Sequence, residues 1–414
     1  MGQTGGVKAY VAVTAAYWAF MLSDGALLML VLLHFHTLGF SPVELAYLFL
    51  LYEVAGIVTN LSAGWLAGRF GLTSTLYAGL GLQVAALLAL AALDPGWEVS
   101  LSVAYVMAVQ GVSGVAKDLA KMSSKSAVKL LAPAEGGGLF RWVALLTGSK
   151  NAVKGLGFFI GAALLGIAGF EAALLGTAAL LAVILLGTVL FMPPGLPGGR
   201  KGTKVSAVWP RDADIRALSL ARVFLFGARD TWFVVGIPVF FYAMLSDGTA
   251  EGNRTAFFTI GAFMAGWVIF YGAVQAATPR LLARRTGTRA ETVRQARVWA
   301  GVLTVIPAVL AGAAIAALPG LVWIVVAGLL VFAVVFALNS ALHSFLILDF
   351  AKSERVTMDV GFYYMANAGG RLLGTLLSGL SFEAGGVAGC LGAAAAMSGL
   401  SWLAAGRLAA PTPR

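Results

Sequence analysis

Seven charged side chains lie near the centres of long apolar segments of this chain. Four are basic and three are acidic: Lys150, Lys154, Arg229 and Arg371, with Asp24, Glu53 and Asp230. An ionisable group at the middle of a lipid bilayer costs about 2.5–3.5 kcal/mol even on lenient insertion scales. Seven of them together predict a water-accessible pathway lined by these groups. The surplus of cations favours an anionic ligand.

The basic residues have the chemistry of an oxyanion site. Lys150 and Lys154 are four residues apart, so both project from one helix face. We interpret them as contacts for a tetrahedral oxyanion such as phosphate, and structural pairing with acids is the compatible alternative. Arg229 and Arg371 come from the other half of the chain, and guanidinium groups grip tetrahedral oxyanions through two parallel hydrogen bonds. A ligand with an anionic group at each end would suit one cationic cluster per half.

The three acids have two possible roles. A membrane-embedded carboxylate near cations can take up and release a proton, and so couple transport to a proton gradient. Asp24, Glu53 and Asp230 are equally interpretable as fixed counter-ions that keep the empty site neutral. We expect Arg229 to point about a quarter-turn away from its neighbour Asp230.

Three further polar residues are candidates for ligand contact. Asn151 and Asn367 lie beside turns that bear cations, and each either adds a neutral hydrogen bond or packs as a buried polar group. Arg222 lies seven residues before Arg229 on the same helix face, near the predicted cytoplasmic end. It either contacts the ligand or snorkels to the interface.

A basic stripe follows the fourth apolar segment, with four lysines that recur every four residues: Lys117, Lys121, Lys125 and Lys129. Contact with anionic lipid and the charge bias of cytoplasmic loops account for such a stripe. Capture of an anionic ligand from the cytosol is the alternative.

The elements that must position these groups are membrane-spanning helices. Of 414 residues, 60% are hydrophobic and only 11% are charged, whereas soluble domains carry about 25% charged residues. The first segment has full spanning length and no small-residue cleavage site, so we expect it to stay in the protein. Twelve segments of spanning length are predicted, at about 11–33, 43–67, 72–93, 98–116, 139–165, 168–192, 215–243, 255–279, 296–317, 320–348, 358–382 and 385–407.

The basic residues also set the orientation. If the N-terminus is cytoplasmic, 21 of the 28 lysines and arginines lie inside, six lie in or at the edge of spans, and only Arg254 lies outside. Both termini are therefore predicted to be cytoplasmic. The net charge of +10 has the same origin, so it requires no nucleic-acid partner.

The chain repeats itself, at offsets of 206, 216 and 217 residues. The matches are Phe20, Asp24 and Phe35 with Phe226, Asp230 and Phe241; Gly56 and 66–71 with Gly272 and 282–287; and 154–157 with 371–374. A consistent register predicts two parallel six-helix bundles, residues 1–192 and 215–414, joined by a cytoplasmic linker at 193–214. The predicted fold class is an all-α polytopic membrane protein with pseudo-symmetric halves.

This organisation resembles the major facilitator superfamily. Residues 64–71 are similar to its loop signature G-x-L-a-D-r-x-G, with Gly68 in place of the acid. At finer grain the chain resembles the ArsJ-type organoarsenical efflux permeases of that superfamily. The blocks that carry this likeness are 24–26, 31–36, 123–129, 141–151, 226–230 and 356–367.

The resemblance implies a function. It implies export of 1-arseno-3-phosphoglycerate by alternating access across the cell inner membrane, which confers arsenate resistance. This ester forms when a glycolytic dehydrogenase accepts arsenate in place of phosphate, so a functional link to glyceraldehyde-3-phosphate dehydrogenase is implied. We expect a monomer in contact with membrane lipid. A general organic-phosphate or sugar-phosphate exporter and a non-transporting membrane anion sensor are the alternatives.

Missing motifs restrict the chemistry further. The one cysteine, Cys390, can form neither an internal disulfide nor a multi-thiolate site for trivalent arsenic. No phosphate-binding loop of the form G-x-x-x-x-G-K-[ST] occurs, so ATP is not predicted to drive transport directly. The pair His34 and His36 projects to different helix faces, so no metal is expected. Without a nucleophile and base in the spans, neither an enzyme nor a cofactor is predicted.

Overall fold

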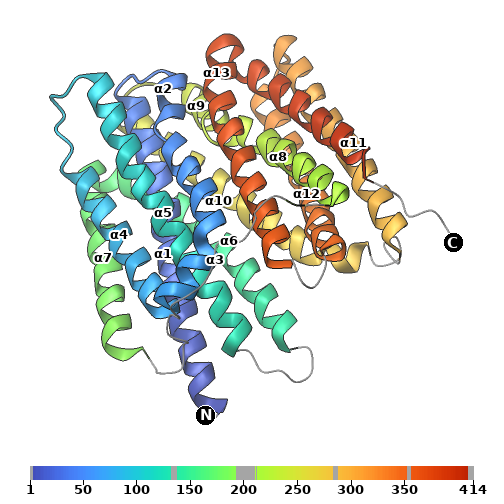
Figure 1. The fold of residues 1–414 in the computed structure, drawn as a ribbon. Helices are drawn as coiled ribbons and strands as arrows, with labels where there is room; N and C mark the ends of the chain where they lie inside the picture. The colour runs from blue at the N-terminus through green and yellow to red at the C-terminus, as the bar shows by residue number, and fades with distance from the viewer. Residues whose placement is uncertain are drawn as a thin grey trace. The chain divides into compact units, whose positions relative to one another are not determined.

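The computed structural model describes residues 3–131, 138–192, 210, 212–282, 288–351 and 356–408. Within these ranges the side chains of 3–10, 61, 63–68, 125–131, 138–148 and 356–358 are outside the description. The described chain is helical and contains no strand (Figure 1). Its helices are α1 Gln3–Thr37, α2 Pro42–Tyr47, α3 Leu50–Phe70, α4 Leu72–Ala91, α5 Val99–Leu131, α6 Gly138–Ala168, α7 Phe170–Phe191, α8 Ala213–Phe233, α9 Gly236–Leu245, α10 Ala250–Leu281, α11 Arg289–Ile315, α12 Leu321–Phe350 and α13 Val356–Ala405.

Eleven helical segments of the described chain are long and apolar enough to cross a membrane. The last of them holds two of the twelve predicted spans, because α13 is broken at Gly385 and Gly386. Gly386 has φ +56° and ψ −147°, a backbone conformation that glycine adopts without steric cost. Two glycines thus replace a loop between the eleventh and twelfth predicted spans.

Two predicted spans are each made of a pair of helices. The second consists of α2 and α3, and the seventh consists of α8 and α9. The start of α2 is set by a capping box, in which the Ser41 hydroxyl accepts from the Glu44 amide and the Glu44 carboxylate accepts from the Ser41 amide. Pro42 at the first helical position fits the same boundary.

Helix α5 is longer than predicted, since it ends at Leu131 and not near residue 116. Beyond residue 116 the sequence is rich in alanine, lysine and serine and contains neither glycine nor proline before Pro133. Such residues sustain a helix after the apolar run has ended. The hydropathy of the sequence thus predicted the apolar part of α5 but not its polar extension.

The chain forms two compact units, each of which takes one segment from the other half of the sequence. Unit 1 consists of Met1–Leu38, Val58–Ser206 and Asp247–Ile269. Unit 2 consists of Gly39–Ile57, Ala207–Ser246 and Phe270–Arg414. The predicted bundles 1–192 and 215–414 stay a prediction, and most of the predicted linker lies outside the described residues.

In unit 1, glycines bring α1 and α6 into close contact. A Cβ atom added at Gly157 would lie 2.3 Å from the carbonyl oxygen of Leu22, and one at Gly161 would lie 2.3 Å from that of Ala26. Gly157 and Gly161 are four residues apart, which is the small-residue spacing that lets membrane helices approach backbone to backbone.

In unit 2, α8 and the first part of α13 pack in the same manner. A Cβ atom at Gly370 would lie 2.2 Å from the carbonyl oxygen of Val223, and one at Gly374 would lie 2.6 Å from that of Gly227. Arg371 falls between these two glycines. The close helix contact therefore places its side chain beside α8.

Candidate functional site

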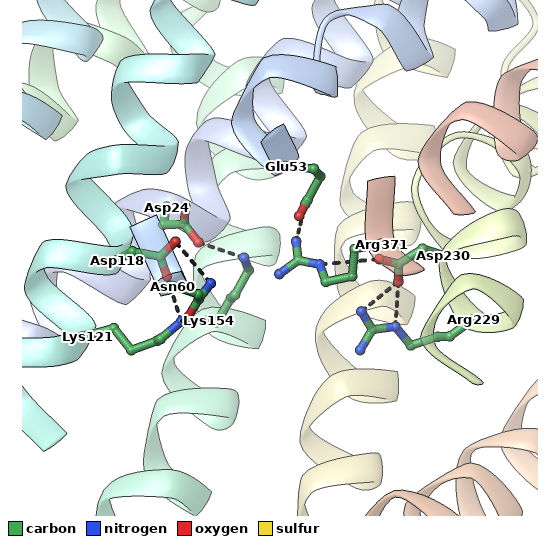
Figure 2. A network of polar contacts seen from close by, with 9 residues as sticks. All are labelled: Asp24, Glu53, Asn60, Asp118, Lys121, Lys154, Arg229, Asp230 and Arg371. Atoms are coloured by element: carbon green, nitrogen blue, oxygen red, sulfur yellow. Dashed lines mark hydrogen bonds and ion pairs between the residues drawn. The ribbon is translucent and has the colours of Figure 1, made fainter. Parts of the chain in front are cut away.

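Unit 1 holds an ion pair between α1 and α6. Lys154 Nζ lies 2.6 Å from Asp24 Oδ2 (Figure 2). The Asp24 side chain is 2% exposed and that of Lys154 is 17% exposed, so the acid is buried behind a cation that solvent reaches. This pair matches the counter-ion interpretation of Asp24.

The surroundings of this pair fix the register of α6 against α1. Trp18 Nε1 donates to Ser149 Oγ at 2.9 Å, one turn before Lys154. The next two residues, Lys150 and Asn151, are partly exposed on α6. The Lys154 ammonium also lies 5.8 Å from the ring centre of Phe158.

A second acid of unit 1, Asp118 on α5, was missed by the sequence analysis. Its side chain is fully buried and accepts from Thr59 Oγ1 at 2.6 Å. It also accepts from Asn60 Nδ2 at 3.4 Å and from Lys121 Nζ at 2.6 Å (Figure 2). Lys121 also donates to Asn60 Oδ1 at 2.8 Å. The available signal in the sequence was the acid three residues before Lys121, a spacing that places both side chains on one helix face.

The expected basic stripe needs a correction at its first two members. Lys117 is only 8% exposed, and Lys121 is partly buried against Asp118. Both lysines interact electrostatically with the buried Asp118, so they do not form a fully exposed stripe, and contact with lipid or ligand stays a prediction. The side chains of Lys125 and Lys129 lie outside the described residues.

Unit 2 holds a chain of alternating charges. Arg229 Nε donates to Asp230 Oδ1 at 2.6 Å, Asp230 Oδ2 lies 3.4 Å from Arg371 Nε, and Arg371 Nη2 pairs with Glu53 (Figure 2). Two cations and two carboxylates balance in this quartet. Both acids are buried, at 2–4% exposure, whereas Arg229 is 16% exposed and Arg371 is 22% exposed.

The position of Arg229 differs from the expectation. A quarter-turn separates neighbouring residues on a helix, yet the guanidinium of Arg229 folds back onto Asp230. The arginine side chain is long enough to reach around the helix, and the buried carboxylate attracts it. The rings of Phe226 and Phe233 flank the guanidinium at 4.8 Å and 5.8 Å.

Arg222 does not snorkel to an interface, since only 5% of the residue is exposed. Its Nε donates to Asn367 Oδ1 at 3.0 Å, and its Nη1 donates to Ser340 O at 3.2 Å and Ser340 Oγ at 3.1 Å. The Phe226 ring centre lies 4.0 Å from its guanidinium carbon. The two predicted candidates Arg222 and Asn367 are thus brought together by α8 and α13.

The two ion pairs occupy repeat-related positions. Asp24 and Asp230 are 206 residues apart, and Lys154 and Arg371 are 217 apart. The structure pairs Asp24 with Lys154 in unit 1 and Asp230 with Arg371 in unit 2. The first and fifth predicted spans of each half therefore carry the same acid–base contact.

His34 and His36 do not form a metal site with other described residues. Among the residues that the structure describes, no three histidine, cysteine or acidic side chains gather closely enough to hold a metal ion. The His34 ring stacks on Phe170, with ring centres 3.9 Å apart. This contact joins the end of α1 to the start of α7.

The family model described as Major Facilitator Superfamily matches residues 13–375. The chain belongs to this superfamily. Its fold is similar to that of the nucleoside transporter NupG, with 15% identity and a TM-score of 0.70 over 97% of this chain and 98% of that one. The fold is also similar to that of a bacterial homologue of the iron transporter ferroportin in the inward-facing state. The identity is 14% and the TM-score is 0.71, over 97% of this chain and 98% of that one.

A transporter of the POT family in complex with 5-aminolevulinic acid is similar as well, with 13% identity and a TM-score of 0.70 over 96% of this chain and 94% of that one. No curated protein matches the sequence. Superfamily membership and the shared transporter fold support a secondary transporter. The predicted all-α major facilitator fold is confirmed.

Proposed function

We propose that this superfamily member exports an anionic phosphorylated organoarsenical, 1-arseno-3-phosphoglycerate, and so confers arsenate resistance. It does so by alternating access in the cell inner membrane, with both termini in the cytoplasm. Lys150 and Lys154 in unit 1 and Arg229 and Arg371 in unit 2 are the proposed cargo contacts. Asn151 and Asn367 add neutral hydrogen bonds.

The exposure of the ion pairs supports this proposal most directly. In each pair the carboxylate is 2–4% exposed, whereas Lys154, Arg229 and Arg371 are 16–22% exposed. An arriving anion would meet the basic group first and would not have to displace the acid. The acids balance the charge of the cations, which lowers the desolvation cost of holding them within the membrane.

Glu53 is the best candidate for proton coupling. Its side chain is buried and pairs through Oε1 with Arg371, while its Oε2 has no hydrogen-bond partner among the described residues. In Asp230, by contrast, each oxygen faces a guanidinium group. A proton can therefore bind Glu53 without breaking a bond at Oε2, and protonation would release Arg371 towards an anion.

The cargo is tested by arsenic resistance. Cells that carry this protein with a glyceraldehyde-3-phosphate dehydrogenase should resist arsenate and gain nothing against arsenite, since a cationic, thiol-poor site suits oxyanion esters. Cells with the dehydrogenase alone are the control. Equal protection against both arsenic species would contradict the oxyanion interpretation. Export of 3-phosphoglycerate at the same rate as the arsenical would favour a general organic-phosphate exporter.

A further inference from the structure

A second polar cluster of unit 2 lies around Arg222, apart from the quartet of Arg229, Asp230, Arg371 and Glu53. The hydrogen-bond partners of Arg222 are neutral: the side chain of Asn367 and the hydroxyl and carbonyl groups of Ser340. No carboxylate among the described residues forms an ion pair with it. A buried guanidinium whose described partners are neutral leaves a positive charge that a bound anion would balance.

Helix α12 adds polar groups to this cluster that the sequence analysis overlooked. Asn339 and His343 are fully buried and one helical turn apart, so they share a face of α12. Neither polar atom of the Asn339 side chain and neither ring nitrogen of His343 has a hydrogen-bond partner among the described residues. Ser340, between them in sequence, binds Arg222, and the charge of Arg222 acts on His343.

Unsatisfied groups of this kind are rare in protein interiors, because each one loses its bonds to water on burial. Here they lie on α12 on either side of Ser340, which accepts from Arg222, and they include the amide of Asn339 and an imidazole that can donate from one nitrogen. The Nη2 atom of Arg222 also donates to none of the described residues, whereas Nε and Nη1 are both used. A positive charge accompanied by hydrogen-bond donors without partners is suited to binding a tetrahedral oxyanion.

We propose that Arg222, Asn339 and His343 form a binding site for a phosphoryl group. If the phosphoryl group is that of the exported cargo, this inference rests on the proposed function. The Phe226 ring supports the geometry, since its centre lies 4.0 Å from the Arg222 guanidinium carbon and 4.8 Å from that of Arg229. Both guanidinium groups thus lie beside one ring, so a phosphoryl group bound at Arg222 would lie close to the proposed cargo contact Arg229.

Binding to the full-length protein in lipid nanodiscs tests the site. Inorganic phosphate and 3-phosphoglycerate are titrated separately by calorimetry at constant ionic strength. Arg222→Gln should weaken binding by at least about tenfold, as loss of a charge-assisted hydrogen bond predicts. Arg216→Gln on the same helix is the matched control, because Arg216 donates to the backbone of Pro210. Binding of both probes assigns a general phosphate site, and binding of 3-phosphoglycerate alone assigns a site for phosphate esters.

A second variant, Asn339→Leu, tests the site independently in case Arg222→Gln does not fold. Asn339→Leu keeps the volume of the side chain and removes two unsatisfied buried atoms, so the unfolding temperature without ligand should be equal or higher. Its phosphate affinity should nevertheless fall. A lower unfolding temperature with unchanged affinity would overturn the assignment, as would wild-type affinity in Arg222→Gln.

The two proposals can fail separately. Loss of 3-phosphoglycerate binding in Arg371→Gln but not in Arg222→Gln would overturn the Arg222 site and leave the export function standing. Absence of binding of either probe to the wild type would also overturn the site. The resistance of cells to arsenate then decides the export function on its own.

Discussion

Lys154 donates to Asp24 over 2.6 Å, although 130 residues separate them in the chain. The repeat-related residues of the other half, Arg371 and Asp230, lie 3.4 Å apart. Each half thus uses its first and fifth predicted spans to hold one acid against one base. Because a parallel repeat places equivalent helices in equivalent packing, a contact found in one unit is expected in the other.

Replacing one partner of the Asp24–Lys154 pair should destabilise the protein more than replacing both partners. Lys154→Gln leaves a buried carboxylate without its cation, and loss of one partner of a buried pair costs about 3–5 kcal/mol. We expect the lower end of this range, since Lys154 is 17% exposed. The double variant Asp24→Asn, Lys154→Gln should recover most of this stability and still fail to export. Thermal unfolding of the purified protein measures the first effect, and equal unfolding temperatures for the single and double variants would contradict it.

The close contact of α1 with α6 should tolerate no side chain at Gly157. Gly157→Ala puts a Cβ atom 2.3 Å from the Leu22 carbonyl oxygen, so the helices must separate. Overpacking of this kind costs about 1–3 kcal/mol or more, and separation also weakens the Asp24–Lys154 pair. Both the unfolding temperature and export should fall. Gly176→Ala on α7 is the control, since no atom lies within 4 Å of its added Cβ; an equal loss there would refute the packing explanation.

Arg371→Lys should abolish most export although it preserves the charge. Arg371 faces Glu53 and Asp230 at once, and one ammonium cannot reproduce the fork of a guanidinium. A lost charge-assisted hydrogen bond of about 1.5–3 kcal/mol predicts transport slower by about tenfold or more. The measurement is transport into everted vesicles. Arg289→Lys is the matched control, because its pair with Asp349 is partly exposed and such pairs contribute about 0–1 kcal/mol. Normal transport by Arg371→Lys would remove the two-pronged contact from the mechanism.

Glu53→Gln should separate binding from coupling. Glutamine imitates a permanently protonated acid and leaves a side-chain oxygen that can accept from Arg371. We expect 3-phosphoglycerate binding to persist while uptake into everted vesicles loses its dependence on the proton gradient. Asp230→Asn is the comparison, since both Asp230 oxygens already face guanidinium groups. An unchanged response of Glu53→Gln to the gradient would exclude Glu53 as the coupling group.

The sequence by itself determined the class of the protein, its spans and its midmembrane charges. These follow from a one-dimensional rule, because the thickness of a bilayer sets the length of an apolar helix and makes any charge within it costly. The same rule placed Lys154, Arg229 and Arg371 among the candidates. It failed where no bilayer rule applies, at the polar extension of α5.

Only the tertiary structure decided which groups meet. Glu53 and Arg371 pair across 318 residues, and no local spacing relates them. Asn339 and His343 lie in apolar sequence that has the same composition whether it faces lipid or the protein interior, and Asp118 lies in the polar extension of α5. Their partners depend on how each helix is rotated, which is set by side-chain packing such as that of Gly157 on Leu22. Helix rotation is a property of two surfaces in contact, so a single segment read alone cannot specify it.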